Sequence, residues 1–547
     1  MAASQPFGIS CKGGLNTNLN QLEMLSQPGL ATKLQNFEVD PDGGYRRING
    51  FTAFGSTRPN SSNRVLGIQV YADGVVVCSG TDIFFSIDGN SWLQINRSSV
   101  HSSGDNYSTF TGRSVLTRSG QKQTSFAVFE GNTDYGALII CDGANKPYYF
   151  YMTGTGDLNT RTFFAEEITV NSTEAPDVCA IHDHHLVVAG TSANKNTIYY
   201  SHNFEPNNFT GTGAGSIKLS DQVVAIKSFR NDLMVFCKNS IHKLININDS
   251  SNIAVVPVTK NVGCLSSHSV QEIGGDLVFL SPDGIRSVAG TARIGDIELG
   301  SVSRQVQELI SNLATFIDTH TITSAVLRKK SQYRLFYSPA TGNVADSKGI
   351  IGTLTANGFE FSETKGIQAL GLDSGFDEEN IEKVYHGDKD GYIYNHDTGT
   401  SFLSSGAAQN IDAQYVTPNY DFGDVGTRKT MHYAKISVSP EGGVTPTLRV
   451  RYDYEDPNIP QPADYPLATI PLPATFGTSV FGTGVFGASN DPMVRQAIEG
   501  SGHAVSFRVS SLDQNPSYSI NGIYTVSYTH LRAHETREDL VCRLLLE

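Results

Sequence analysis

The sequence predicts an all-β protein, with a β-propeller-like body of about six or seven blades and a C-terminal β-sandwich. The first observation behind this prediction is a weakly repeated unit that recurs about seven times between residues 70 and 400: an apolar strand, a turn rich in Gly, Asp or Asn, and a second strand that is often aromatic. The second is composition, because 53 Gly, 23 Tyr and 28 Phe with only 17% charged residues suit strands joined by tight turns. The third is a run of longer alternating strands after the repeats.

Each repeat is predicted to form a β-hairpin. The copies are DGVVVCSGTDIFFS from Asp73, GALIICDGANKPYYF from Gly136, HDHHLVVAGTSANKNTIYYSH from His182, RNDLMVFCKNSIHKLI from Arg230, GGDLVFLSPDGIRSV from Gly274, QYRLFYSPATGNVADSKGIIGTL from Gln332 and KVYHGDKDGYIYNHD from Lys383. They start about 45 to 65 residues apart, which is typical of four-stranded propeller blades. The pattern favours a scaffold over a catalyst.

Four regions are predicted along the chain. Residues 1–60 form a lead that ends in a hairpin, NFEV and YRRI joined by the turn Asp40–Gly44, and residues 61–405 form the propeller. Residues 406–526 form the sandwich, in which Leu448, Val450 and Tyr452 alternate with polar residues. Residues 527–547 turn rich in Arg and Leu, resemble translated adaptor or vector sequence, and are interpreted as a non-native tail.

One segment of the predicted propeller has a helical pattern. In SVSRQVQELISNLATFIDTH, near residues 301–318, apolar residues recur at steps of three and four and define one face of an amphipathic helix. That face either packs on the β-body or forms a subunit interface. Its residues are Val302, Val306, Leu309, Ile310, Leu313, Phe316 and Ile317.

A long Pro-rich stretch interrupts the predicted sandwich and ends in FGTSVFGTGVFG. It is longer than an ordinary sandwich turn, and long structured loops are often functional. Phe476, Phe481 and Phe486 either form a loop tip that contacts a partner or fold back on their own domain.

Charge and cysteine usage limit the function classes. The formal net charge of -14 argues against gripping nucleic acid through a basic face. The seven cysteines form no CxxC pair, which supports neither a zinc site nor a disulfide framework, and no cofactor is predicted. The first residues have no secretory pattern and no apolar run approaches the length of a membrane span. We therefore expect a soluble protein made in a reducing cytoplasm.

No candidate for catalysis or metal binding stands out in the sequence. His182, Asp183, His184 and His185 are adjacent, but neighbours on a strand point to opposite faces, so a polar strand end is the better interpretation. The run His386–Gly391 contains alternating Asp residues before a Gly and lacks the later Glu of a calcium loop, so a hairpin turn explains it.

Two further motifs have structural explanations. The run Ser86–Trp92 is close to an Asp-box, which pins a hairpin corner in sialidase-type propellers. Cys264 and His268 lie four residues apart, and that spacing alone does not make a nucleophile and its base. No pair of carboxylates is marked for glycoside hydrolysis. The sequence therefore predicts a protein that is not an enzyme.

Three segments together resemble the tail nozzle, or tail tubular, proteins of short-tailed bacteriophages and the related packaged-DNA stabilisation proteins. They are the lead GGLNTNLNQLEMLSQPGLATKLQNFEVDPDGGYRRINGF, the run VGCLSSHSVQEIGGDLVFLSPDGIRSV with the helical SRQVQELI, and the C-terminal GSGHAVSFRV and YSINGI with the Phe-Gly loop. The resemblance covers most of residues 7 to 526. The tail after residue 526 departs from it.

The resemblance implies a structural subunit of the virion tail, made in the host cytoplasm. It implies a ring of identical chains, a homohexamer, that contacts the adaptor and portal rings, the tail fibres and the double-stranded DNA that leaves through the ring without sequence-specific binding. Two other interpretations remain open at this stage: a glycan-binding propeller that recognises a receptor, and a sialidase-like glycosidase.

Overall fold

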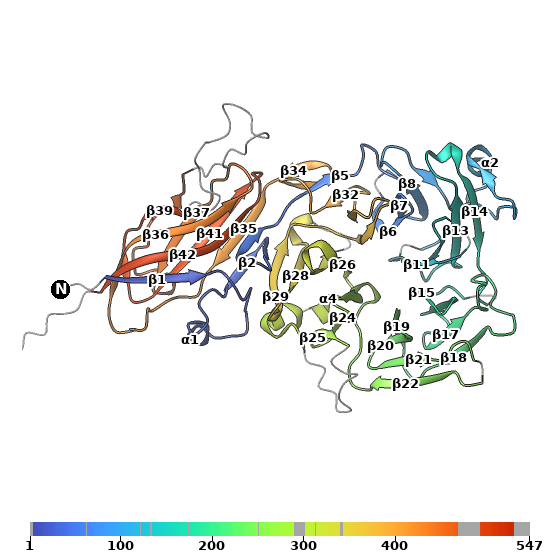
Figure 1. Cartoon of the computed structure of the whole chain (residues 1–547), viewed down its shortest axis with the longest axis horizontal. Coiled ribbons are helices and arrows are strands. Elements are labelled where there is room, and N and C mark those ends of the chain that lie inside the picture. Colours follow the sequence, from blue (N-terminus) through green and yellow to red (C-terminus); the bar gives the residue numbers. More distant parts are fainter. Residues whose placement is uncertain are drawn as a thin grey trace, which may run out of the picture. The chain divides into compact units, whose positions relative to one another are not determined.

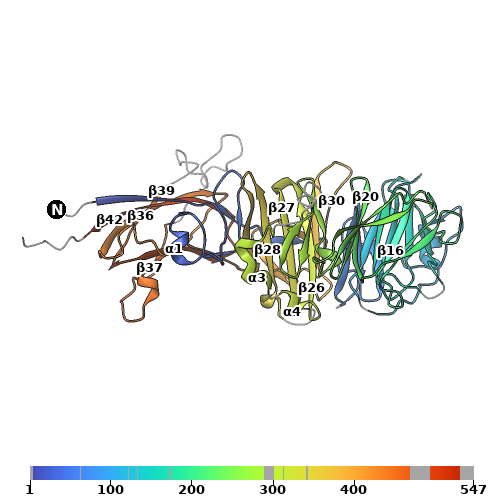
Figure 2. The ribbon, with the colours of Figure 1, turned by 90° about the horizontal axis from the view of Figure 1, so that it is seen from below.

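The computed structural model describes residues 4–61, 63–120, 122–131, 134–171, 174–249, 251–288, 301–311, 313–339, 343–468 and 493–529. The chain divides into two compact units, residues 1–47 with 412–547, and residues 48–411. Both are built almost wholly of strands, as predicted, and are drawn in Figure 1 and, turned by 90°, in Figure 2. Residues 1–47 of the expected lead thus belong with the C-terminal strands, and residues 48–60 belong with the propeller.

The first unit is a β-sandwich that both ends of the chain build. One sheet has the order β3 (Phe37–Val39), β4 (Tyr45–Arg47), β42 (Tyr518–Thr529), β36 (Lys429–Pro440) and β39 (Met493–Ala497), with β1 (Ser4–Ser10) on β42 and β40 (Ser501–Gly502) on β36. The other contains β2 (Lys33–Gln35), β35 (Ile411–Val416), β41 (Val505–Asp513), β37 (Thr447–Tyr452) and β38 (Tyr465–Pro466). The unit also holds the helix α1 (Gln21–Met24) and the short turn η7 (Asp453–Glu455).

Local sequence explains these strands. In β37 the buried residues Leu448, Val450 and Tyr452 alternate with partly exposed arginines, which confirms the predicted two-faced strand. The predicted hairpin also forms, because Phe37 to Val39 pair with Arg47 to Tyr45. Its turn needs glycine, since Gly43 and Gly44 have φ of 105° and 106°.

The second unit is a β-propeller, viewed along its axis in Figure 1. Among the described residues, six of its sheets have four or five strands and a seventh has three. The first three sheets are β6 (Val65–Tyr71), β7 (Gly74–Ser79), β8 (Asp82–Ser86), β9 (Leu93–Gln94); β10 (Asp105–Asn106), β11 (Ser125–Phe129), β12 (Ala137–Cys141), β13 (Tyr148–Thr153), β14 (Thr162–Glu167); and β15 (Val178–His182), β16 (His185–Ala189), β17 (Thr197–Tyr200), β18 (Gly215–Lys218).

The remaining sheets follow in chain order. They are β19 (Val223–Phe229), β20 (Asp232–Cys237), β21 (Ile241–Ile245), β22 (Ala254–Thr259); the three-stranded β23 (Gln271–Ile273), β24 (Asp276–Ser281), β25 (Gly284–Ser287); β26 (His320–Leu327), β27 (Gln332–Pro339), β28 (Lys348–Thr355), β29 (Gly358–Lys365); and β30 (Gly371–Phe376), β31 (Glu382–Gly387), β32 (Ile393–His396), β5 (Phe51–Ala53). A small hairpin joins β33 (Phe402–Ser404) to β34 (Ala407–Gln409).

The seven sequence repeats are the second and third strands of these seven sheets. For example, the copy from Asp73 is the β7–β8 hairpin and the copy from Lys383 is the β31–β32 hairpin. The prediction of a propeller with about six or seven blades is confirmed. The inner and outer strands were less visible because they vary more in length and apolar content.

The propeller closes on itself through an early strand. The three-residue strand β5 pairs with β32, Phe51 to Ala53 against His396 to Tyr394, and so supplies the outer strand of the last sheet. Phe51 stacks on Phe402 and meets His386 and Tyr394 edge-on or tilted. One residue from before the repeats therefore anchors the closure of the ring of blades.

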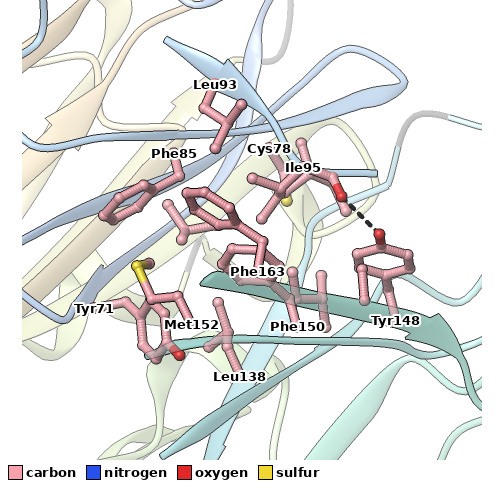
Figure 3. Packing of buried hydrophobic residues seen from close by; sticks show 14 of the residues in the cluster. Tyr71, Cys78, Phe85, Leu93, Ile95, Leu138, Tyr148, Phe150, Met152 and Phe163 are labelled. Carbon is pink, nitrogen blue, oxygen red and sulfur yellow. Dashed lines mark hydrogen bonds between the residues drawn. The ribbon is translucent and has the colours of Figure 1, made fainter. Parts of the chain in front are cut away.

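Aromatic clusters fill the space between neighbouring blades. Figure 3 shows one of them, in which Phe85 of β8 lies with Phe150 and Phe163 of the next sheet, all fully buried. The Tyr148 hydroxyl donates to the Ile95 carbonyl over 2.6 Å, which satisfies its one polar atom. Burying each such ring contributes about 2–3 kcal/mol, so these clusters hold adjacent blades together.

Helical structure in the propeller is short. Besides α2 (Tyr107–Gly112) and the turns η1 (Leu158–Thr160), η2 (Ser267–Ser269), η5 (Arg328–Lys330) and η6 (Val344–Asp346), the predicted helix near residues 301–318 consists of η4 (Arg304–Val306), α3 (Gln307–Ser311) and α4 (Leu313–Phe316). Its apolar residues divide by burial: Val306, Ile310 and Leu313 are buried within the unit, whereas Val302, Leu309 and Ile317 are partly exposed and Phe316 is 43% exposed.

Candidate functional site

A polar cavity of about 380 Å³ lies where the innermost strands of the propeller meet. Its lining comes from β6, β11, β15, β19, β23, β26 and β30, and from the turn η2. This volume is within the range of about 300–1,000 Å³ that small-molecule sites occupy. The cavity is the candidate functional site of the propeller.

One wall of the cavity holds a carboxylate in a fixed position. Asp373 of β30 accepts hydrogen bonds through Oδ2 from the Gln69 side chain, at 2.9 Å, and from the Val70 backbone, at 2.8 Å. Both donors belong to β6, the inner strand of the adjacent blade. Burial raises the pKa of Asp373 to about 6, although hydrogen bonds from the Val70 and Ser374 backbones and the positive charges of Lys227 and Arg328 oppose the shift.

Lys227 of β19 supplies the cationic group of the cavity lining. Its side chain is exposed to the cavity space, and among the described residues Nζ has no hydrogen bond and no ion pair within 4.0 Å. The surrounding protein lowers its pKa because burial disfavours the charged form. Asp373 and Glu272 act in the opposite direction through their negative charge.

Neutral polar groups complete the lining. The side-chain amide of Gln123 donates to the Ile322 carbonyl at 2.7 Å, and that of Gln271 donates to the Ser324 carbonyl at 2.9 Å. His268 of η2 also faces the cavity, and burial lowers its pKa to about 4, so its imidazole is neutral at pH 7.

The histidine cluster of the sequence forms a hairpin end. Asp183 and His184 are the two turn residues between β15 and β16, both with positive φ, and His184 stacks on Phe204. His182 contacts the Ser228 hydroxyl at 2.9 Å, while His185 contacts the Ser201 carbonyl and the Asn248 side chain. In the part of the chain that is described, no three such side chains gather in a metal-binding group.

The run His386–Gly391, which resembles a calcium loop, forms a hairpin turn. Asp388 is buried, and its carboxylate accepts hydrogen bonds from the Asp390 and Tyr392 backbone and from the Tyr394 hydroxyl, each at 2.9 Å. Gly391 has a φ of 83°, as the turn requires. The oxygens that a cation would need are occupied by these donors.

The Asp-box-like run pins a corner. Asp88 accepts from the Asn90 and Ser91 backbone at 2.9 and 3.2 Å, and the Trp92 indole donates to the Thr57 carbonyl at 3.3 Å. These contacts fix the turn after β8.

Cys264 and His268 have different surroundings. Cys264 is buried in an apolar cluster, its thiol donates to the Ser266 carbonyl, and burial raises its pKa to about 11. No hydrogen bond joins it to His268 within the described ranges. A protonated thiol without a base is no nucleophile at pH 7.

The other predicted contact residues have mixed outcomes. Phe476, Phe481 and Phe486 lie outside the described residues. Phe316 is the most exposed residue of the predicted helix face. A subunit interface at this segment stays a prediction, and it concerns only the exposed residues of that face.

Sequence reasoning did not single out Lys227, Asp373 and the glutamines of the cavity. All but Gln123, which precedes β11, stand in the inner strand before a hairpin repeat, and Lys227 and Asp373 lie in the runs Ala-Ile-Lys-Ser-Phe and Gly-Leu-Asp-Ser-Gly. A charged residue at the centre of a buried strand was the available signal. It was missed because only the hairpins were aligned.

No protein-family model matches the chain, and no curated protein matches it. Solved structures with a similar fold include an exo-β-1,3-galactanase from Phanerochaete chrysosporium with galactotriose, at 9% identity over 90% of this chain and 99% of that chain, with a TM-score of 0.25. Others are the Neurospora crassa Pan2 WD40 domain, at 8% identity over 68% and 91% with a TM-score of 0.27, and PorZ of the Porphyromonas gingivalis type-IX secretion system, at 10% over 70% and 44% with a TM-score of 0.34.

One prediction is corrected by these comparisons. The chain was predicted not to be an enzyme because a propeller without marked catalytic residues favours a scaffold, but glycoside hydrolases are among the similar structures. A fold that serves hydrolases and WD40 domains alike does not decide between them. Within the described residues, the structure contains no helix that is long and apolar enough to span a membrane.

Proposed function

We propose that this chain is a ring-forming subunit of the tail nozzle of a short-tailed bacteriophage. The observation that carries the proposal is the pairing of two segments that resemble that family. The lead and the C-terminal run are far apart in sequence, yet Tyr45 and Arg46 of the lead pair with Ile520 and Ser519 of the C-terminal run. Most of the lead and the whole C-terminal run, two of the three resembling segments, thus belong to one unit.

The surface of the sandwich supports self-assembly. Six of the eleven exposed large apolar residues belong to this unit, although it is much the smaller of the two in described residues. They are Leu22, Val425, Tyr454, Met493, Leu512 and Tyr524. We propose that these side chains gather on the face that a neighbouring copy covers, since a contiguous exposed apolar patch marks an interaction surface. We propose that six copies associate through their sandwich units.

The proposed ring sits in the virion tail below the adaptor and portal rings and contacts the tail fibres. Each chain is made in the host cytoplasm and then assembled. The net charge of -14 gives a ring of six copies a strongly negative field, which repels DNA phosphates and keeps the exit path free of tight contacts. A cryo-EM ring whose bore is lined mainly by Lys and Arg would contradict this part of the proposal.

Imaging and mass measurement test the assembly directly. Purified protein should form rings with a central opening wide enough for a DNA duplex, visible by negative-stain electron microscopy. Leu512→Glu and Val425→Glu should convert the rings to monomers without lowering the melting temperature, because both side chains are exposed, at 66% and 68%.

Matched control variants lie on the propeller. Val115 and Ile381 are exposed at 41% and 49%, and Val115→Glu and Ile381→Glu should leave the rings intact. A wild-type protein that stays monomeric at the concentrations used for imaging contradicts the proposal. If the propeller variants disrupted the rings and the sandwich variants did not, the contacts between copies would lie on the propeller, which also contradicts the proposal.

A further inference from the structure

We propose that the central cavity of the propeller binds a neutral, polyhydroxylated small molecule of about monosaccharide size. The first observation is a pair of side chains that have no partner there. Among the described residues, neither the Lys227 ammonium nor the His268 imidazole makes a hydrogen bond, although both line the cavity. Lys227 is exposed and His268 is partly exposed, so the polar groups of both are available to hydrogen-bond water or a ligand in the cavity.

The cavity also presents oriented hydrogen-bond acceptors. Gln69, Gln123 and Gln271 each use their side-chain NH₂ on the protein wall, to the Asp373 carboxylate, the Ile322 carbonyl and the Ser324 carbonyl respectively. Each amide is thereby fixed, and no described group donates to its oxygen. Three amide oxygens thus stand as acceptors along the lining.

The balance of charge selects the class of ligand. The positive charge of Lys227 repels a cation, and the negative charge of Asp373 with the amide oxygens repels an anion. Neither a small amine nor a small carboxylate therefore satisfies all of these groups. Glu272 and Arg328, which also act on Lys227, add one further charge of each sign. Hydroxyl groups donate to the acceptors and accept from Lys227 and His268, and a polyol carries several of them without net charge.

The way the cavity is built also suits a small rigid ligand. Its residues stand on inner strands that the flanking blades hold in register, so they need little rearrangement when a ligand enters. The site does not depend on ring assembly, and monomeric variants of the sandwich unit should retain it.

Ligand-observed NMR and isothermal titration calorimetry on the full chain test the proposal. The probes are D-glucose, D-galactose, N-acetyl-D-glucosamine and myo-inositol, with acetate as the anionic and ethanolamine as the cationic comparison. We expect at least one neutral probe to bind with a Kd of about 1–10 mM, which is ordinary for a ligand of this size. Neither charged probe should bind more tightly.

Two cavity variants and one control localise the binding. Lys227→Met and Gln271→Leu should each weaken the neutral probe about tenfold or more, because each removes one fixed hydrogen-bonding group. Lys243→Met removes a lysine that pairs with Asp232 outside the cavity and should leave the affinity unchanged. The proposal is overturned if no neutral probe binds, if a charged probe binds best, or if the cavity variants bind as the wild type does.

Discussion

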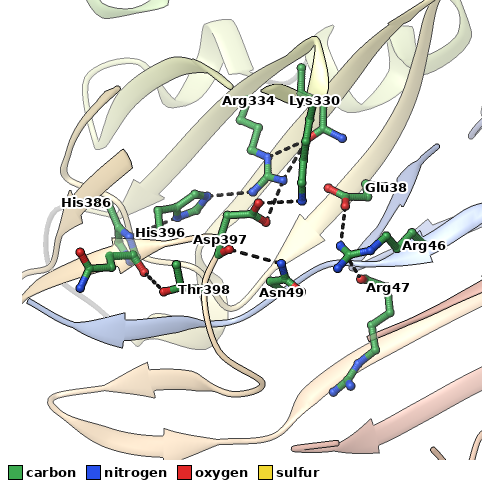
Figure 4. A network of polar contacts seen from close by, with 12 residues as sticks. Glu38, Arg46, Arg47, Asn49, Lys330, Arg334, His386, His396, Asp397 and Thr398 are labelled. Carbon is green, nitrogen blue, oxygen red and sulfur yellow. Dashed lines mark hydrogen bonds and ion pairs between the residues drawn. The ribbon is translucent and has the colours of Figure 1, made fainter. Parts of the chain in front are cut away.

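The propeller contains two groups of charged side chains, and they are arranged in opposite ways. Where the closing blade meets the preceding sheet, shown in Figure 4, Arg334 of β27 is fully buried and donates to Gln332, His396 and Asp397 at 2.8–3.2 Å. In the central cavity, Lys227 has no partner within 4.0 Å among the described residues. The guanidinium of the first group has protein partners and the ammonium of the second has none, which separates a structural network from a candidate binding site.

The network also fixes the protonation of two histidines. Arg334 can only donate, so Nε2 of His396 accepts, and the proton of His396 lies on Nδ1, which contacts Nδ1 of His386 at 3.2 Å. His386 therefore carries its proton on Nε2. Both rings are neutral and buried beside the closing strand β5, where His386 meets Phe51.

The largest expected effect comes from breaking this network. Arg334→Met should lower the free energy of unfolding by about 3–5 kcal/mol, because it removes the ion pair with Asp397 and the donor to His396. Urea denaturation followed by tyrosine fluorescence measures the change. Lys218→Met, at an exposed lysine of β18, serves as the control and should stay within about 0.5 kcal/mol of wild type. A small effect at Arg334 would mean that the network does not hold the closing blade.

Acid should weaken the same blade by a smaller amount. Burial lowers the pKa of His386 to about 3 and holds that of His396 well below its ordinary value, so the unfolded chain binds protons at a higher pH than the folded one does. Stability is then lost as pH falls below about 6.5, by about 2 kcal/mol for each histidine at pH 5.

Thermal melts from pH 8 to pH 4 check this dependence. His386→Asn should flatten the decline between pH 6.5 and pH 5, even if it lowers the melting temperature throughout that range. His101→Asn, at an exposed histidine, should leave the profile as it is. An unchanged slope in the His386 variant would contradict the assignment.

The fold was predicted well where short-range sequence patterns determine it. The hairpins were visible because turn residues such as Gly391 and apolar runs such as Val75–Val77 are short-range signals. The closing role of Phe51 and the pairing of Ser4–Ser10 with the C-terminal strand were not predicted, since nothing local marks pairing across several hundred residues.

The candidate site was far less predictable than the fold. Lys227 and Asp373 come from inner strands of different blades, and only closure of the propeller brings Gln69 to Asp373. The motifs that were visible, such as His182–His185 and His386–Gly391, proved to be turns and blade contacts, because turn chemistry and ligand chemistry use the same residues.

The smallest expected effect on stability concerns Lys227 in the central cavity. Lys227→Met should change the free energy of unfolding by less than about 1 kcal/mol, because the side chain is exposed and no hydrogen bond or ion pair among the described residues is lost. The same substitution should raise the pKa of Asp373 above its value of about 6, since it removes a positive charge that favours the carboxylate. NMR titration of the Asp373 carboxyl carbon measures that shift, and Lys243→Met should not cause it. If Lys227→Met destabilised the protein as strongly as Arg334→Met, the cavity charge would be part of the framework, and the distinction between the two groups would fail.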